Sequence, residues 1–427
     1  MGSYAGLYLD ALQVDWSKNA APELWPVLFA PEHYFRRPPR QAHRDVRRAL
    51  RREWQDSDWS EYFYFRADAR SVWDRLTVLG YSETLVRELW AQSRTESIKD
   101  YRARTDSGRV LAARADEMEA QNFDGWCEAM RAEAAGKTRF HDYTIDQDPI
   151  ADLAAKMIAL QPRTVWADVT DVYESGYLSV DEVPHASLEP SRERVDLAFT
   201  KILILTEGRS DQRLIETALR RFYPHLADLY SFVDFEGFRV EGGASPVGRL
   251  LKGLAGAGLS GRIIAIFDND AAGHETLLSL KTVQFPDTIR VLTLPTNELA
   301  RRYPTVGPTG LQVADVNGSA CAIELYLGRR SLTFDGALLP VRWSQWNPRS
   351  QRYQGELENK GQVAEKFLAE LERAQTPAAL QRAYPEMDAL LQSLFAVYAD
   401  PPLRPHPAPL TTLPSVQNDG RKSQNSR

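Results

Sequence analysis

This 427-residue sequence lacks several features that would assign it to a familiar class. It has only two cysteines, Cys127 and Cys321, which lie far apart and form neither a disulfide framework nor a zinc site. No apolar run approaches the roughly 18 residues of a membrane span, and the N-terminus lacks the basic and apolar regions of a signal peptide. We therefore expect a protein of the reducing cytoplasm that does not contact a membrane.

A net positive charge and a phosphate-binding loop are also missing. The formal net charge is −6, so a nucleic acid would have to be bound by local basic patches or through a metal. The pattern G-x-x-x-x-G-K-[ST] does not occur, and the glycines within 253–261 indicate the end of a helix. The chain thus carries no recognisable ATPase motif of its own.

What the sequence does contain is two short apolar runs that end in acidic residues. Residues 201–206 (KILILT) lead into Glu207, and residues 262–267 (RIIAIF) lead into Asp268 and Asp270. A continuous apolar run of this length is typical of a strand that is buried on both faces in a parallel sheet. Acids just past the carboxyl ends of such strands lie where open α/β sheets carry their chemistry.

These acids predict a metal site. Side chains two positions apart on an extended strand point the same way, so Asp268 and Asp270 can converge on one point. Carboxylates gathered in one crevice repel one another unless a cation lies between them, and Mg²⁺ is the usual cation. Asp211, four residues after Glu207, is either an acid at the start of a helix or a ligand of a second metal.

Strands alternate with helices around these acids. We predict strands at 201–206, 229–235, 262–267 and 288–294, and helices at 211–221, 246–257 and 271–280. Such alternation predicts an α/β fold with a parallel sheet flanked by helices on both faces. This domain would span 195–375 and end in an amphipathic helix, followed by a helix at 376–400 and a disordered tail at 401–427.

Residues 1–190 predict a separate α+β domain that is mostly helical. The partial alternation of residues 3–18 predicts a β-hairpin with its turn at Asp10 and Ala11. Apolar residues at three-and-four spacing predict helices at 71–89, interrupted at Gly80, and at 111–131 and 149–160. The junction between the two domains is predicted near 189–194.

An arginine-rich segment in this first domain has two interpretations. Residues 36–52 hold eight arginines and one acid, Asp45. They form either a solvated helix face, balanced by the acids that follow from Glu53 to Glu61, or a patch that binds a phosphate backbone. The arginines of the second interpretation are Arg36, Arg37, Arg40, Arg44, Arg47 and Arg48.

The spacing of Arg36 or Arg37 to His43 also fits the Arg-x4–6-His motif of metal-independent HEPN ribonucleases. Pro38 and Pro39 interrupt the helix that such a site uses, so we reject this interpretation.

The two acidic motifs together resemble a known domain. E-G-x-x-D after one strand, followed about sixty residues later by D-x-D after another, resembles the Toprim domain of topoisomerases, primases and OLD-family nucleases. The resemblance covers about residues 200–330, or extends to 375 if the amphipathic helix belongs to the domain. The opening M-G-S-Y-A-G-L-Y resembles the HEPN/Toprim-associated domain found at the N-terminus of bacterial proteins with these modules.

The resemblance implies a phosphoryl-transfer site that depends on Mg²⁺ or Mn²⁺ and acts on DNA or RNA. Glu207 would be a metal ligand or general acid/base, and Asp268 and Asp270 would be metal ligands. In OLD-type nucleases a later acid and a lysine complete a two-metal site, and the positions that fit here are Glu324 and Lys360. Each of these two also has a plain interpretation as a polar helix residue.

Some parts of these families are missing. The sequence has no separate cleavage domain of a topoisomerase, no zinc domain of a primase and no ATPase half of the OLD architecture. Nucleotide-driven sensing would therefore need a partner ATPase or another defence-system protein, since such proteins are associated with antiphage defence.

Our leading hypothesis is a metal-dependent endonuclease in which residues 1–190 serve substrate binding, assembly or control. One alternative is a non-catalytic, metal-dependent nucleic-acid-binding or sensor subunit. Another is a Mg²⁺-dependent phosphatase or nucleotide hydrolase. The sequence leaves open whether the chain assembles into a homo-oligomer.

Overall fold

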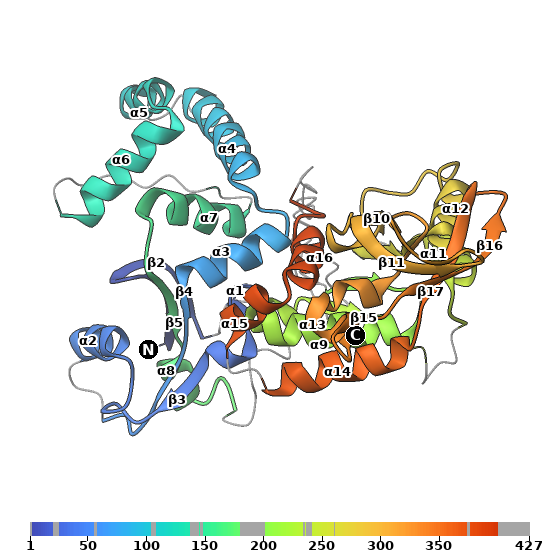
Figure 1. Ribbon diagram of the computed structural model, residues 1–427. Coiled ribbons are helices and arrows are strands. Elements are labelled where there is room, and N and C mark those ends of the chain that lie inside the picture. The colour runs from blue at the N-terminus through green and yellow to red at the C-terminus, as the bar shows by residue number, and fades with distance from the viewer. Residues whose placement is uncertain are drawn as a thin grey trace, which may run out of the picture.

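Strands β6 (Ile202–Leu205) and β8 (Ile263–Phe267) form the centre of a four-stranded parallel sheet in the computed structural model (Figure 1). Strands β7 (Tyr230–Phe232) and β10 (Ile289–Thr293) form its edges, in the order β10-β8-β6-β7. Each neighbouring pair is parallel. The predicted parallel sheet is therefore confirmed, with edge strand β7 shorter than expected.

The structure describes residues 2–19, 25–54, 58–103, 108–136, 145, 148–179, 201–233, 235, 241–259, 261–373 and 376–399. The predicted junction at 189–194 and the predicted tail at 401–427 lie outside these residues. Within these ranges, no helix is long and apolar enough to cross a membrane.

Alternate residues of the central strands enter two separate hydrophobic cores. Ile204 and Ile264 join the core that contains residues of α9 (Arg209–Phe222). Leu205 and Ala265 join a second core with residues of α11 (Ala244–Gly256) and α12 (Ala271–Leu280). Both faces of the sheet are covered, which explains why these strands read as continuous apolar runs rather than alternating ones.

A second four-stranded sheet follows the parallel sheet and was not predicted. Its order is β12-β11-β16-β17, from β11 (Tyr303–Gly307), β12 (Gly310–Ala314), β16 (Val341–Asn347) and β17 (Arg352–Leu357). Four of the five residues of β12 are exposed. An exposed strand carries no burial-driven period, so hydrophobic pattern alone could not reveal it.

The N-terminal domain contains a five-stranded antiparallel sheet in the order β2-β1-β5-β4-β3. The predicted hairpin is confirmed as β1 (Tyr4–Leu9) and β2 (Leu12–Lys18), with Asp10 in the left-handed region at φ 52°. The sequence did not predict the other three strands, β3 (Tyr34–Arg37), β4 (Tyr62–Asp68) and β5 (Thr164–Asp168).

Two of the predicted helices are each divided into two shorter helices in the structure. The expected helix at 111–131 is α5 (Gly108–Ala120) and α6 (Phe123–Ala134), because the Asn122 side chain accepts a hydrogen bond from the Gly125 N–H and caps a new helix. The expected helix at 376–400 is α15 (Pro377–Ala383) and α16 (Pro385–Phe395), because Pro385 has no N–H and disfavours helical geometry at the residue before it.

The predicted interruption at Gly80 is confirmed. It separates α3 (Ala69–Val78) from α4 (Glu83–Ala103), and Gly80 has a φ of 103°. The helix predicted at 149–160 is α7 (Pro149–Leu160).

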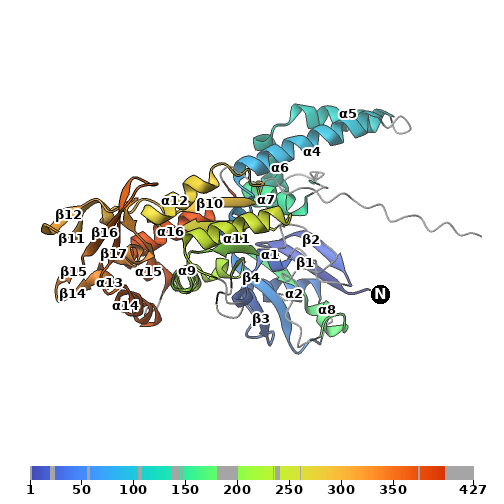
Figure 2. The same ribbon diagram turned by 90° about the vertical axis from the view of Figure 1, so that its right-hand side faces the viewer.

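The remaining elements are short or peripheral (Figures 1 and 2). They are α1 (Trp25–Leu28), η1 (Pro31–His33), α2 (Arg44–Glu53), α8 (Thr170–Glu174), α10 (Pro224–Ala227), β9 (Asn269–Asp270), η5 (Leu299–Arg302), β13 (Ala320–Cys321), η6 (Ile323–Tyr326), α13 (Gly328–Leu332), β14 (Thr333–Phe334), β15 (Ala337–Leu338) and α14 (Lys360–Arg373).

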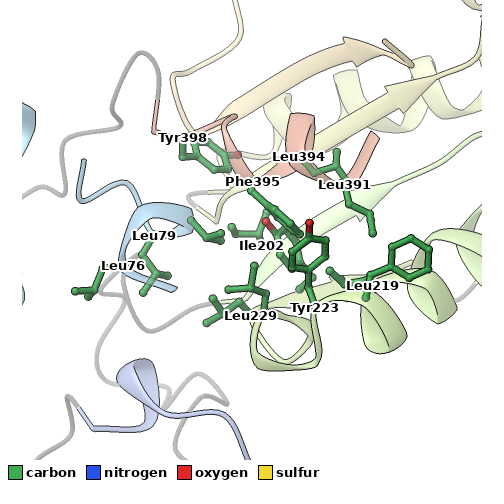
Figure 3. Close-up of a cluster of buried hydrophobic side chains, with 14 of the residues drawn as sticks. Leu76, Leu79, Ile202, Leu219, Tyr223, Leu229, Leu391, Leu394, Phe395 and Tyr398 are labelled. Atoms are coloured by element: carbon green, nitrogen blue, oxygen red, sulfur yellow. The ribbon is translucent and has the colours of Figure 1, made fainter. Parts of the chain in front are cut away.

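The N-terminal domain packs against the amino edge of the parallel sheet. The guanidinium of Arg75, on α3, is fully buried and donates to both carboxylate oxygens of Asp228 at 2.6 and 2.9 Å. Arg262, just before β8, donates to the Leu79 carbonyl at 3.2 Å. Figure 3 shows Leu76 and Leu79 beside the side chains at the start of β6 and on α16. The opposite, carboxyl edge of the sheet is the one that carries the acids.

Candidate active site

The two acidic motifs meet at the carboxyl edge of the parallel sheet. Strands β6 and β8 are adjacent, with Leu205 opposite Ala265, so the residues that follow them emerge side by side. The Glu207 carboxylate accepts a hydrogen bond from the backbone N–H of Asp268 at 2.8 Å. Residues 61 positions apart in the sequence are thus in direct contact, as the strand pattern predicted.

Asp270 is held by two hydrogen bonds at the start of α12. One carboxylate oxygen accepts the Gly273 N–H at 2.7 Å and caps the helix. The other oxygen accepts the Gln354 side-chain amide at 2.6 Å, which ties the second sheet to the site. Asp270 is buried, and its side chain is fixed from both sides.

Glycines allow the backbone to turn tightly around these acids. A Cβ at Gly273 would lie 2.2 Å from the Asp268 carbonyl oxygen, so no other residue fits there without displacing the acidic loop. Gly243, with a φ of 103°, donates its N–H to the Glu207 carbonyl at 2.6 Å. Neither glycine was predicted as part of the site, although the spacing D-x-D-x-x-G is a signal for Gly273.

The structure brings three further predicted residues to the same edge. Asp211 lies in the first turn of α9, and Glu324 is buried in η6 beside Ile323, whose N–H donates to Asp268 at 3.2 Å. Lys360 begins α14, and its ammonium lies 2.5 Å from Glu356. The charge of Lys360 acts electrostatically on both Asp211 and Glu324.

Burial and mutual repulsion raise the pKa values of these acids. Burial and then the charge of Asp270 raise the pKa of Glu207 to about 8, and the hydrogen bond from Asp268 only partly offsets them. Burial raises the pKa of Asp268 well above its usual range, and the charge of Glu207 adds to this effect. Burial also raises the pKa values of Asp211 and Glu324. The surroundings of the site therefore do not stabilise all of these carboxyl groups in their charged form.

The donor set fits a hard cation, because every predicted ligand supplies carboxylate oxygen, the ligand type that Mg²⁺ and Mn²⁺ prefer. The carboxylates of these acids nevertheless point toward other protein groups. In the part of the chain that the structure describes, no three His, Cys, Asp or Glu side chains are placed to hold one metal ion. Glu207, Asp268 and Asp270 each accept a backbone N–H instead, so a cation would have to replace these hydrogen bonds.

Gln354 and Glu356, both on β17, contact the site but were not predicted. They lie two positions apart on the strand, so their side chains point to the same face. No acidic motif or buried run surrounds them in the sequence, so no pattern marked them as part of the site. Only the pairing of β17 within the second sheet brings them to the parallel sheet.

The predicted arginines lie elsewhere. Arg36 and Arg37 are on β3, and Arg44, Arg47 and Arg48 are on α2, in the N-terminal domain and away from the acids (Figures 1 and 2). Arg36 forms an ion pair with Glu61, but Arg36 and Arg37 lie on a strand and not on the helix face of the first interpretation. Arg40, Arg44 and Arg48 are exposed.

The comparisons with known proteins concern this N-terminal domain. Residues 1–162 match the family model described as HEPN/Toprim N-terminal domain 1. The match supports a HEPN/Toprim-associated N-terminal domain. The match ends just before β5, the middle strand of the antiparallel sheet, so this sheet extends beyond the matched residues. Neither the curated proteins nor the solved structures gave a match.

Proposed function

We propose that this protein is a metal-dependent nuclease that hydrolyses phosphodiester bonds of DNA or RNA at the carboxyl edge of the parallel sheet. The observation that carries this proposal is the environment of Asp268. Asp268 is half-buried, and burial together with the charges of Glu207, Asp211, Asp270 and Glu324 raises the pKa of its carboxyl group. So many neighbouring carboxyl groups do not stabilise the fold, and a bound divalent cation would reduce the repulsion between their charges. The match to a HEPN/Toprim-associated domain supports a function related to nucleases.

Each residue of the site has a proposed role. Asp268, Asp270, Glu207, Asp211 and Glu324 would hold Mg²⁺ or Mn²⁺, which in such sites polarises a phosphoryl oxygen and lowers the pKa of a bound water. Glu207 would also exchange a proton with the reacting oxygens, since its raised pKa lies near neutrality. Lys360, half exposed at the start of α14, would neutralise the charge that develops on the phosphate.

The test is cleavage of plasmid DNA and of structured RNA by the full-length protein with Mg²⁺ or Mn²⁺. We expect product that disappears with EDTA and falls by at least about 100-fold in Glu207→Ala and Asp268→Ala, because each removes a predicted ligand. Asp287→Ala is the matched control, since Asp287 is an exposed acid of the same domain that forms a surface ion pair with Arg290. Undiminished cleavage in both site variants would rule out this assignment.

The main competing proposal is a non-catalytic sensor or nucleic-acid-binding subunit. The observation that favours it is that the acids, in the described ranges, are hydrogen-bonded to backbone N–H groups and not grouped around one ion position. It predicts metal-dependent binding with no product after long incubation. Release of phosphate from a small phosphate ester, with indifference to polynucleotide, would instead indicate a phosphatase.

A role in antiphage defence, with a partner ATPase or another defence-system protein, is part of this proposal. An infection assay with cells that produce the wild-type protein or Asp268→Ala tests it. We expect protection only with the wild-type protein if cleavage is the means of defence.

A further inference from the structure

The N-terminal domain contains an aromatic pocket far from the carboxylates. It has a volume of about 330 Å³ and is lined by Tyr4, Ala5, Gly6, Tyr8, Gln13, Trp16, Trp54 and Asp168. Tyr4 and Trp16 are 40% and 59% exposed, so the pocket opens to solvent. We call this site the aromatic pocket.

The pocket follows from the pairing of three strands. Gly6 lies opposite both Trp16 on β2 and Asp168 on β5, so these side chains face the same side of the sheet as Tyr4 and Tyr8. A Cβ at Gly6 would lie 2.8 Å from the Tyr8 ring, so the glycine leaves the space that becomes the pocket. The Tyr8 ring is itself stacked on Trp166 at 3.9 Å, which gives the pocket a rigid wall.

The pocket contains a negative charge, and positive charges lie outside it. Asp168, inside it, is buried, with its carboxylate bonded to Thr170. A buried carboxylate disfavours a phosphate inside the pocket, so the pocket suits the uncharged ring of a base better than the backbone. Outside the pocket, α2 ends directly before Trp54 and carries an exposed stripe of Arg44, Arg48, Arg51 and Arg52.

The arginine stripe is too long for a single phosphate. Arg44 and Arg52 are eight residues apart on a helix that rises 1.5 Å per residue, or about 12 Å along its axis. A second hollow of about 400 Å³, lined by His43, Arg44, Asp45, Arg48 and Arg66, lies at the other end of α2. A row of cations that leads to an aromatic pocket matches the way proteins bind single-stranded nucleic acid, with phosphates on the cations and bases stacked on the rings.

We propose that the aromatic pocket and the arginine stripe of α2 together bind a single strand of nucleic acid, with one unpaired base between the pocket's aromatic side chains. This inference rests on the proposed function, because that function makes nucleic acid the substrate, and it names the substrate class as one that contains unpaired nucleotides. It also gives the HEPN/Toprim-associated domain a role in holding the substrate at a distance from the carboxylates.

The test is equilibrium binding of the full-length protein to a labelled single-stranded oligonucleotide and to the duplex of the same sequence, in EDTA so that no cleavage occurs. We expect Trp16→Ala to weaken single-strand binding by roughly 5- to 100-fold and duplex binding much less, because one stacked base is lost. Trp16→Phe should restore most of the binding, since it keeps an aromatic face. Tyr177→Ala is the matched control, an aromatic residue of the same domain that is 51% exposed and outside the pocket.

Arg48→Ala tests the stripe separately. It should weaken single-strand and duplex binding alike and reduce the salt dependence by about one phosphate contact. Free mononucleotides, added as competitors at the concentration of the oligonucleotide, should not displace the strand. The proposal is overturned if Trp16→Ala binds like Tyr177→Ala, if duplex is bound as tightly as single strand, or if a mononucleotide competes fully.

The two proposals can fail separately. Loss of strand binding in Trp16→Ala with no cleavage under any metal condition would support this site and contradict the nuclease. Cleavage that needs Asp268 but is unaffected by Trp16→Ala, together with unchanged binding, would do the reverse.

Discussion

The two edges of the parallel sheet differ in how their buried charges are compensated. At the amino edge, the charge of Arg75 is neutralised by Asp228. Apolar side chains of the N-terminal domain, the parallel sheet and α16 pack together at this edge (Figure 3). Tyr398 closes this edge, because its single hydroxyl proton is shared between the carbonyls of Thr288 at 2.7 Å and Ile263 at 3.0 Å. At the carboxyl edge, four carboxylates surround that of Asp268, and the charge of Lys360 acts on two of them, Asp211 and Glu324.

This difference distinguishes an edge whose charges stabilise the fold from an edge whose charges serve a function. Buried charge that is paired and fully hydrogen-bonded is tolerated by a fold, whereas buried charge of one sign destabilises it and persists where it serves a purpose. The amino edge is therefore the place where the two domains are joined. The carboxyl edge is the place where a ligand is expected. Four predictions test this division, from the largest expected effect to the smallest.

Removing the partner of Arg75 should have the largest effect on stability. Asp228→Ala leaves a fully buried guanidinium without its carboxylate and should lower the free energy of unfolding by about 3–5 kcal/mol. Urea unfolding at neutral pH measures this. Glu216→Ala, which breaks an exposed pair with Arg220, is the control and should cost less than about 0.5 kcal/mol. If the two variants were equally stable, the amino edge would not depend on this pair.

A methyl group at Gly273 should distort the carboxyl edge. Gly273→Ala places a Cβ 2.2 Å from the Asp268 carbonyl oxygen and should lower the free energy of unfolding by about 3 kcal/mol while abolishing metal-dependent activity. Gly253→Ala, within α11 and with no atom near its Cβ, should instead stabilise the protein by up to about 1 kcal/mol. Thermal unfolding of both variants gives the comparison. Equal effects would mean that the acidic loop adapts freely.

The carboxyl edge should make stability fall as pH rises. The pKa of Glu207 is raised from 4.5 to about 8, so the folded protein binds this proton more tightly than the unfolded chain does. Its stabilising effect is complete below pH 4.5 and is lost as pH rises toward 8. Glu207→Gln keeps a hydrogen-bond acceptor without the charge and should exceed the wild type by about 2 kcal/mol at pH 9 in EDTA.

Urea midpoints between pH 5 and 9 measure this difference. Glu216→Gln, at a half-buried glutamate on α9, is the control, and a Glu207→Gln curve parallel to that of the wild type would contradict the raised pKa.

Divalent cations should produce the smallest effect. Mg²⁺ at ten times its dissociation constant should stabilise the wild-type protein by about 1.4 kcal/mol, because the ion binds only the folded site. Asp268→Ala should lose this response, and the Asp287→Ala control should keep it. Thermal unfolding with and without Mg²⁺ measures the shift independently of cleavage. A response in Asp268→Ala equal to that of the wild type would place the ion elsewhere.

Sequence patterns predicted the parallel sheet well because its strands are buried on both faces. Ile263–Phe267 is apolar throughout, and the acids follow at the point where burial ends. Hydrophobic pattern missed β12, which is exposed, and the four-residue β3, and it missed β4 and β5 although both of these strands are largely buried. It also joined helices that Asn122 and Pro385 separate, since caps are local signals that a general helical period obscures.

The sequence by itself determined which acids end which strands, because a strand's burial and its carboxyl end are local properties of the chain. Tertiary structure alone decided three contacts. Glu207 accepts the Asp268 N–H, Gln354 donates to Asp270, and Arg75 pairs with Asp228. It also decided that Gly6 opens a pocket between Trp16 and Asp168. These contacts join residues far apart in sequence, and their geometry depends on strand order and packing, which no local pattern encodes.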